Sequence, residues 1–126
     1  MKVYLAGGMH GDWRDIYTVS VRADFYDPKT HNLTVADEYT LWDLTAIEQC
    51  EVFLGFMEAD NPSGQGLTLE IGYAKALGKK IILVVEEEFV NQDRYRYFLM
   101  AEECADAVVF DHDDALKLIQ SLSKII

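Results

Sequence analysis

The segment best equipped for chemistry covers residues 61–84, NPSGQGLTLEIGYAKALGKKIILV, and contains the carboxylate of Glu70. A loop rich in glycine and serine leads here into a helix predicted over residues 67–77. Glycines let backbone N–H groups approach a ligand closely, and the start of a helix carries a partial positive charge. We predict that Glu70, in the first turn of this helix, faces a ligand. A carboxylate at this position can also serve only to complement the helix dipole.

The elements that must position Glu70 alternate between strands and helices from residue 37 onward. Apolar runs predict strands at residues 2–6, 20–26, 52–57, 80–85 and 107–110. Further helices are predicted at residues 13–18, 37–49, 94–103 and 113–124, and residues 29–35 are predicted to form a loop. The helix at 37–49 has an apolar stripe of Leu41, Leu44 and Ile47. This order predicts one α/β domain over residues 1–126, a flavodoxin-like or Rossmann-like three-layer sandwich with a five-stranded parallel sheet.

Ligands of such sheets bind beyond the carboxyl ends of the strands. Three segments follow these ends, namely residues 7–14, 27–33 and 58–70. Asp27 and His31 flank the end of the second strand, where they are candidates to meet a ligand. The glycine-rich loop before Glu70 matches neither the Walker A pattern nor GxGxxG, so it does not indicate a nucleoside triphosphate or a dinucleotide by itself.

The composition limits the partners of this chain. The formal net charge of −11 argues against polymeric nucleic acid, which binds to basic surfaces. One small phosphate is not excluded, because backbone N–H groups at a helix start can hold it. No apolar run reaches the roughly 18 residues of a membrane span, and the N-terminus MKVYLAGG has no signal-peptide pattern. We therefore expect a cytoplasmic protein with no membrane partner.

Cysteine and histidine do not form a metal-binding pattern. Cys50 and Cys104 lie inside apolar or helical segments, which favours reduced core thiols over a disulfide. The three histidines are scattered and CxxC spacing is absent, so we expect neither a metal nor another cofactor.

The run GLTLEIGYAKALGKKIILV resembles the signature of the nucleoside 2-deoxyribosyltransferase family. That family includes 2'-deoxynucleoside 5'-monophosphate N-glycosidases and related CMP hydrolases. Three further segments match it in the same order, Tyr4 within YLAGG, Asp43 within WDLTAIEQCEVFLGF and the closing strand AVVF. The similarity extends over nearly the whole chain and is sharpest over residues 43–84.

The resemblance implies a role for each matching residue. Glu70 corresponds to the nucleophile, Asp43 to the carboxyl group that assists departure of the base, and Tyr4 to the tyrosine that orients the nucleophile. Two alternatives stay open, since Asp43 could be a surface aspartate with a local hydrogen bond and Tyr4 a core tyrosine. The candidate substrate-binding residues are Gly7, Gly8, His10, Arg14, Ser63, Gly64 and Gly66.

The activity implied by the resemblance is cleavage of the N-glycosidic bond of a (deoxy)nucleoside or nucleoside 5'-monophosphate, as in nucleotide salvage. The anomeric carbon C1' gains oxocarbenium character as the base leaves, and a carboxylate beneath it can trap the sugar covalently. A second acid can protonate the departing base. Transfer of the sugar to another base is the deoxyribosyltransferase reaction, and transfer to water is the N-glycosidase reaction.

Recognition of a 5'-phosphate stays open in this chain. The monophosphate hydrolases carry Ser and Arg in the first loop, where this chain has Gly8 and His10. Ser63 lies one residue further from Glu70 than its counterpart, although Ser63 and Arg14 remain candidates for the phosphate.

Two alternative functions also stay open, a non-catalytic nucleotide-binding module and a glycohydrolase of NAD-type nucleotides. The resemblance further implies a homo-oligomer, a dimer or larger, whose neighbouring subunits complete each other's pocket. Residues near Asp106 are candidates to reach across between subunits.

Overall fold

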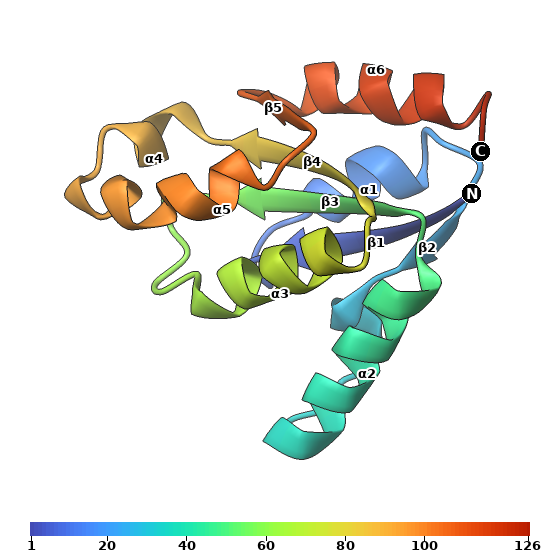
Figure 1. Ribbon diagram of the computed structural model, residues 1–126, viewed down its shortest axis with the longest axis horizontal. Helices are drawn as coiled ribbons and strands as arrows, with labels where there is room; N and C mark the ends of the chain where they lie inside the picture. Colours follow the sequence, from blue (N-terminus) through green and yellow to red (C-terminus); the bar gives the residue numbers. More distant parts are fainter.

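Five parallel strands form the central sheet in the order β2-β1-β3-β4-β5 (Figure 1). The computed structural model describes all residues, 1–126. The strands are β1 (Lys2–Gly7), β2 (Asp24–Tyr26), β3 (Val52–Met57), β4 (Lys80–Val85) and β5 (Ala107–Val109). This is the flavodoxin-like order, which confirms the predicted fold class and places β1 beside the point where the strand order reverses.

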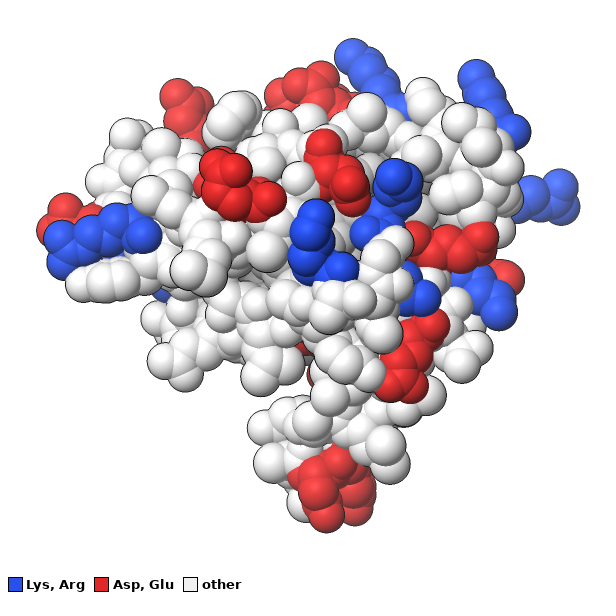
Figure 2. Space-filling model, viewed as in Figure 1, with Lys and Arg blue, Asp and Glu red and all other residues white.

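Helices cover both faces of the sheet. They are α1 (Trp13–Thr18), α2 (Ala36–Gln49), α3 (Gln65–Ala76), α4 (Glu87–Val90), α5 (Leu99–Glu103) and α6 (His112–Leu122), with the 3-10 turns η1 (Pro28–Thr30) and η2 (Asp93–Phe98). Helices α1 and α6 lie on one side of the sheet, whereas α2, α3 and α5 lie on the other (Figure 1). The start of α2 projects away from the body, and in Figure 2 it forms a separate prominence with acidic groups at its tip. None of the helices combines the length and the apolar character needed to cross a lipid bilayer.

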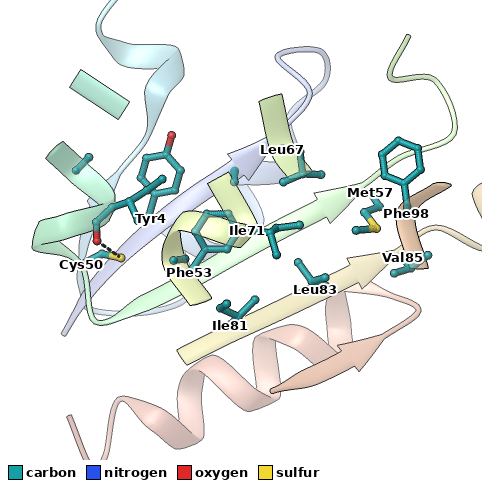
Figure 3. Close-up of a cluster of buried hydrophobic side chains, with 14 of the residues drawn as sticks. Tyr4, Cys50, Phe53, Met57, Leu67, Ile71, Ile81, Leu83, Val85 and Phe98 are labelled. Carbon is teal, nitrogen blue, oxygen red and sulfur yellow. Dashed lines mark hydrogen bonds between the residues drawn. The ribbon is translucent and has the colours of Figure 1, made fainter. Parts of the chain in front are cut away.

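Two apolar clusters hold these layers together, one on each face of the sheet. The cluster under α2 and α3 includes Tyr4, Phe53 and Ile71, and Figure 3 shows their side chains interleaved. Successive residues of a strand point to opposite faces, so the neighbours of Tyr4 in β1, Val3 and Leu5, pack under α1 and α6 instead. Each fully buried apolar side chain of this kind contributes about 1.5–3 kcal/mol relative to its exposed state.

The predictions for β3 and β4 are confirmed residue for residue, because continuous apolar runs of strand length suit a sheet covered on both faces. The prediction for the second strand was too long. The backbone N–H groups of Ser20 and Val21 both donate to the carbonyl oxygen of Tyr17, so these residues close the turn after α1. Only Asp24–Tyr26 pairs with β1.

Other corrections concern the helices. The predicted helix at residues 94–103 is a 3-10 segment followed by the short α5, and α4 was not predicted. A 3-10 turn also interrupts the segment 29–35 predicted as a loop. Of the apolar stripe noted in the helix at 37–49, Leu41 is 71% exposed, whereas Ile47 is fully buried. The reason is the projection of α2, whose first turns extend beyond the edge of the sheet (Figure 1).

Candidate active site

A cleft of about 410 Å³ opens at the carboxyl end of β1. Its walls come from residues 7–10 after β1, from parts of the segment 31–43 around the start of α2, and from residues 61–70 at the start of α3. Two of these segments follow strand ends that the sequence singled out, and the third includes His31. A larger hollow of about 550 Å³ lies against the outer side of α2, but its lining is mainly apolar and includes neither Glu70 nor Asp43.

Glu70 is held in the cleft by Tyr4. The Tyr4 hydroxyl donates a hydrogen bond to Oε2 of Glu70, and the ring stacks on Phe53 with centroids 5.6 Å apart. In Figure 3 the ring of Tyr4 lies in the apolar cluster and its hydroxyl oxygen points out of it. Because β1 crosses beneath α3, a tyrosine in the middle of this strand can be fully buried and still reach the cleft.

The start of α3 differs from the prediction in one respect that matters for Glu70. The helix begins at Gln65 rather than at residue 67, so Glu70 lies in its second turn and no acidic residue lies in the first. Favourable interaction with the helix dipole falls off beyond the first turn. Together with the hydrogen bond from Tyr4, this position disfavours a carboxylate that only complements the dipole.

The surroundings of Glu70 raise its pKa to about 7. Burial of the carboxyl group is the main cause, the hydrogen bond from Tyr4 opposes it, and the negative charge of Asp43 adds to it. The pKa of Tyr4 is also raised, first by burial and then by the charge of Glu70, so Tyr4 stays a hydrogen-bond donor. A carboxyl group that titrates near neutrality is frequent at functional sites.

Asp43 lies on the opposite wall of the cleft, from α2, and is paired with His31. Nε2 of His31 and Oδ1 of Asp43 are 3.0 Å apart. The backbone N–H of Leu33 donates to Nδ1 of the same ring at 2.9 Å, so Nδ1 carries no proton. Neutral His31 therefore carries its proton on Nε2 and donates it to Asp43, which fixes the orientation of that carboxyl group. Burial raises the pKa of Asp43, and the bond to His31 opposes this rise.

Two glycine-rich turns beside the cleft have backbone geometry that requires glycine. Gly7 ends β1 at a φ of +144°, and a Cβ atom there would lie 2.9 Å from the carbonyl oxygen of Phe56. Gly64 precedes α3 at a φ of +74°, and a Cβ atom there would lie 2.7 Å from the ring of Phe98. Both values of φ are unfavourable for residues with a side chain. These two turns therefore depend on glycine.

The structure brings most of the sequence-predicted site residues together. Residues that line the one cleft are Gly7, Gly8, His10, Asp43, Ser63, Gly64, Gly66 and Glu70, with Tyr4 directly behind Glu70. His10 is exposed at the cleft wall, and Oγ of Ser63 accepts a long hydrogen bond of 3.4 Å from the N–H of Gln65. No lysine or arginine side chain lines this cleft.

Arg14 is the exception and requires a correction. It was predicted as a substrate-binding residue, but its side chain is 4% exposed and does not line the cleft. Its guanidinium donates to the carbonyl oxygens of Gly8, Gly7 and Leu5 at 2.8, 3.3 and 3.4 Å, and Nε lies 2.8 Å from Oδ1 of Asp27. After β1 leaves the sheet, the backbone carbonyl groups at its end need hydrogen-bond donors from outside the sheet. The buried side chain of Arg14 supplies these donors.

Sequence reasoning did not find two features of the site. The first is the pairing of His31 with Asp43. These residues are 12 positions apart on either side of the start of α2, and no regular spacing in the sequence indicates such a contact. The second is Glu58, whose side chain lies against Gly8. Its position in a loop after β3 was the only available indication.

Residues 1–89, which include every residue of the site, match the sequence model of the family described as nucleoside 2-deoxyribosyltransferase like. The chain belongs to this family. The resemblance inferred from residues 61–84 is therefore confirmed. A comparison with curated proteins gave no match.

Solved structures similar to this nucleoside 2-deoxyribosyltransferase-like protein share its fold over nearly the whole chain. A 2-deoxyribosyltransferase from Bacillus psychrosaccharolyticus has a TM-score of 0.73 at 20% identity and covers 92% of this chain and 90% of its own. The CMP N-glycosidase BcmB from Clostridium botulinum has a TM-score of 0.63 at 23% identity, covering 99% and 98%. A conserved protein from Enterococcus faecalis has a TM-score of 0.72 at 15% identity, covering 95% and 97%.

The nucleoside 2-deoxyribosyltransferase-like fold thus presents two carboxyl groups to one cleft in different environments. Glu70 is mostly buried and bonded to a phenol, whereas Asp43 is bonded to a neutral imidazole. Burial raises the pKa of both carboxyl groups, and perturbed groups of this kind in a cleft are frequent at functional sites.

Proposed function

We propose that the protein cleaves the N-glycosidic bond of a nucleoside or nucleoside 5'-monophosphate, with Glu70 as the nucleophile. The sugar then passes to a second base, as in a deoxyribosyltransferase, or to water, as in an N-glycosidase. The observation that carries the proposal is the hydrogen bond from Tyr4 to Glu70 inside a cleft that also contains Asp43. Family membership supports the same class of reaction.

The proposed reaction runs in two steps. In the first, a carboxylate oxygen of Glu70 bonds to C1' while the bond from C1' to the base nitrogen breaks, and the electron pair leaves with the base. Asp43 donates a proton to the departing base, which makes the base a better leaving group. In the second step, water or another base attacks C1', the bond from C1' to Glu70 breaks and releases its carboxylate, and the ionised Asp43 takes the proton that the attacking molecule loses.

Each neighbouring residue has a defined task in this scheme. Tyr4 keeps the carboxylate of Glu70 in place and lowers the pKa of that group, which favours the ionised form needed for attack. The raised pKa of Asp43 favours the protonated form needed for donation. Gly7 and Gly64 maintain the two turns that line the cleft, because a side chain at either position would collide with Phe56 or Phe98.

We also propose that copies of this chain associate. The supporting observation is the mainly apolar hollow against α2, whose lining includes Trp42 and Leu41, the latter 71% exposed. In Figure 2 the middle of the projecting α2 carries few charged groups. Exposed apolar patches of this kind often mark interfaces. Light scattering coupled to size-exclusion chromatography would give the mass, and a purely monomeric protein at micromolar concentration would contradict association.

Activity can be tested with a panel of nucleosides and nucleoside 5'-monophosphates, each incubated with and without a second free base and followed by chromatography. Release of free base without an acceptor indicates hydrolysis, and a new nucleoside indicates transfer. Glu70→Gln should lower the rate at least about a thousandfold while ligand binding is retained. Ligand binding by the wild-type chain with no free base from any substrate would favour the non-catalytic binding module. Release of nicotinamide from NAD alone would favour the NAD-type glycohydrolase.

The chain offers a matched control for Glu70→Gln. Tyr73 of α3 donates a hydrogen bond to the exposed Glu48 of α2, a second tyrosine–glutamate pair, and neither residue lines the cleft. Glu48→Gln makes the same chemical change there and should leave turnover unchanged. A similar loss of turnover in both variants would contradict the assignment of Glu70.

A further inference from the structure

The side chain of Glu58 occupies the space that a side chain at position 8 would need. A Cβ atom built on Gly8 would lie 1.9 Å from Oε1 of Glu58 and 3.0 Å from its carboxyl carbon. Gly8 itself lines the cleft, as do residues 61–64 of the loop that Glu58 begins. The glycine and the carboxylate therefore form a pair, because the missing side chain of one makes room for the charged group of the other.

Glu58 has no direct ionic partner. Glu58 takes part in none of the ion pairs of the structure, and its buried Oε1 accepts no hydrogen bond. Burial is the main cause that raises the pKa of Glu58, whereas His10 and Arg14 favour its ionised form, and Arg14 is already paired with Asp27. Glu86 and Asp60 add further negative charge around Glu58. The end of the cleft at Gly8 is therefore an anionic region.

The orientation of the bound sugar determines which of its groups lies next to Gly8 and Glu58. This step rests on the proposed function. With Glu70 beneath C1' and Asp43 beside the base, C4' lies on the other side of the ring oxygen from the base. The substituent on C4' is the 5' group, so it points away from α2, toward the wall formed by Gly8 and residues 61–64. No lysine or arginine in that wall could balance a phosphate.

We infer that Glu58, seated against Gly8, makes the cleft selective for nucleosides with a free 5'-hydroxyl and rejects their 5'-monophosphates. A 5'-hydroxyl is neutral and can be accommodated next to a carboxylate. A phosphate dianion in the same place meets a like charge in a partly buried setting, which disfavours it strongly. Glu58 acts here as a specificity-determining residue and takes no part in bond cleavage.

Paired substrates provide the test. The wild-type protein is assayed with nucleosides and their own 5'-monophosphates, such as cytidine with CMP and deoxyuridine with dUMP, and kcat/KM is compared within each pair. We expect the nucleoside to be preferred at least about tenfold, and Glu58→Gln to reduce this preference by about tenfold, mainly through a lower KM for the monophosphate. Glu58→Asp keeps the charge and should keep the preference. Glu87→Gln, which removes an exposed charge from α4, should leave the ratio unchanged.

The outcomes separate this inference from the proposal on which it rests. A wild-type protein that cleaves monophosphates as well as or better than nucleosides overturns the role of Glu58 and leaves the glycosidic activity intact. Cleavage of neither substrate overturns both. A preference for nucleosides that stays the same in a folded Glu58→Gln variant, verified by its thermal transition, assigns the selectivity to another residue. The wild-type comparison needs no variant. Cleavage of monophosphates by the wild-type protein would therefore overturn the role of Glu58 even if Glu58→Gln does not fold.

Discussion

The hydroxyl of Tyr4, in the middle of β1, donates a hydrogen bond to the carboxylate of Glu70 in the second turn of α3, 66 residues further along the chain. This contact joins the buried core to the cleft. It also opposes the effect of burial on the pKa of Glu70, since it favours the ionised carboxylate. One hydrogen bond thus positions the group proposed to attack C1' and keeps it reactive near neutral pH.

Removal of this contact should change both the rate and its pH dependence. In the wild-type protein the rising limb of kcat/KM against pH should reflect ionisation of Glu70, whose pKa is about 7, and the falling limb should reflect loss of the proton that Asp43 donates. Tyr4→Phe removes the hydrogen bond that lowers the pKa of Glu70, so this rise should move to higher pH. The rate at pH 7 should fall by about tenfold to a hundredfold. The matched control is Tyr73→Phe, which removes the exposed hydrogen bond to Glu48 and should change neither quantity. An unchanged pH profile in Tyr4→Phe would contradict the role of Tyr4.

Replacement of Glu70 should stabilise the folded chain at alkaline pH. The pKa of Glu70 is raised from 4.5 to about 7 on folding, so ionisation of this group costs free energy above pH 7. Glu70→Gln lacks that cost while the amide oxygen can still accept from Tyr4. We expect the free energy of unfolding at pH 8 to exceed that of the wild type by about 1–2 kcal/mol, a figure reduced for partial exposure of the side chain. The difference should disappear below about pH 4.5, where the carboxyl group is neutral in both states. Urea unfolding at both pH values measures it, and a destabilised variant at pH 8 would contradict the sign.

Loss of His31 should impair the proton-donating group without removing it. His31 donates from Nε2 to Asp43, because the N–H of Leu33 occupies Nδ1. His31→Ala frees the Asp43 side chain and should lower kcat by about tenfold or more, with a smaller effect on KM. His31→Gln can still donate to Asp43 and should recover part of the rate. Equal losses in both variants would show that the imidazole does more than orient Asp43.

Arg14 should matter for stability rather than for phosphate recognition. Its guanidinium is buried, donates to three backbone carbonyl groups and pairs with Asp27. Arg14→Met removes these donors and leaves Asp27 without its partner, which should cost about 3–5 kcal/mol in the free energy of unfolding. Nucleosides and monophosphates should lose activity in the same proportion. A folded variant that loses activity on monophosphates alone would restore Arg14 as a phosphate ligand.

Much of the fold was predictable from local patterns. The apolar runs of β3 and β4 predicted their bounds correctly, because a strand buried on both faces has to be apolar throughout. The second strand was predicted less well, since β2 lies at the edge of the sheet, is short, and shows a weak pattern. The segment that became η2 and α5 shows a helical pattern in sequence, but a pattern of this kind does not distinguish a 3-10 turn from an α-helix.

The sequence by itself determined the family, the parallel α/β architecture, and the two carboxylates that deserve testing, because these depend on residue types at local spacings near Glu70 and Asp43. Only the tertiary structure decided which atoms meet. It turned Arg14 inward to the carbonyl groups of the first loop, joined His31 to Asp43, and placed Glu58 against Gly8. The physical reason is that these contacts join segments whose separation and direction follow from the packing of the strands, and no pattern along the chain encodes the direction of a side chain after a turn.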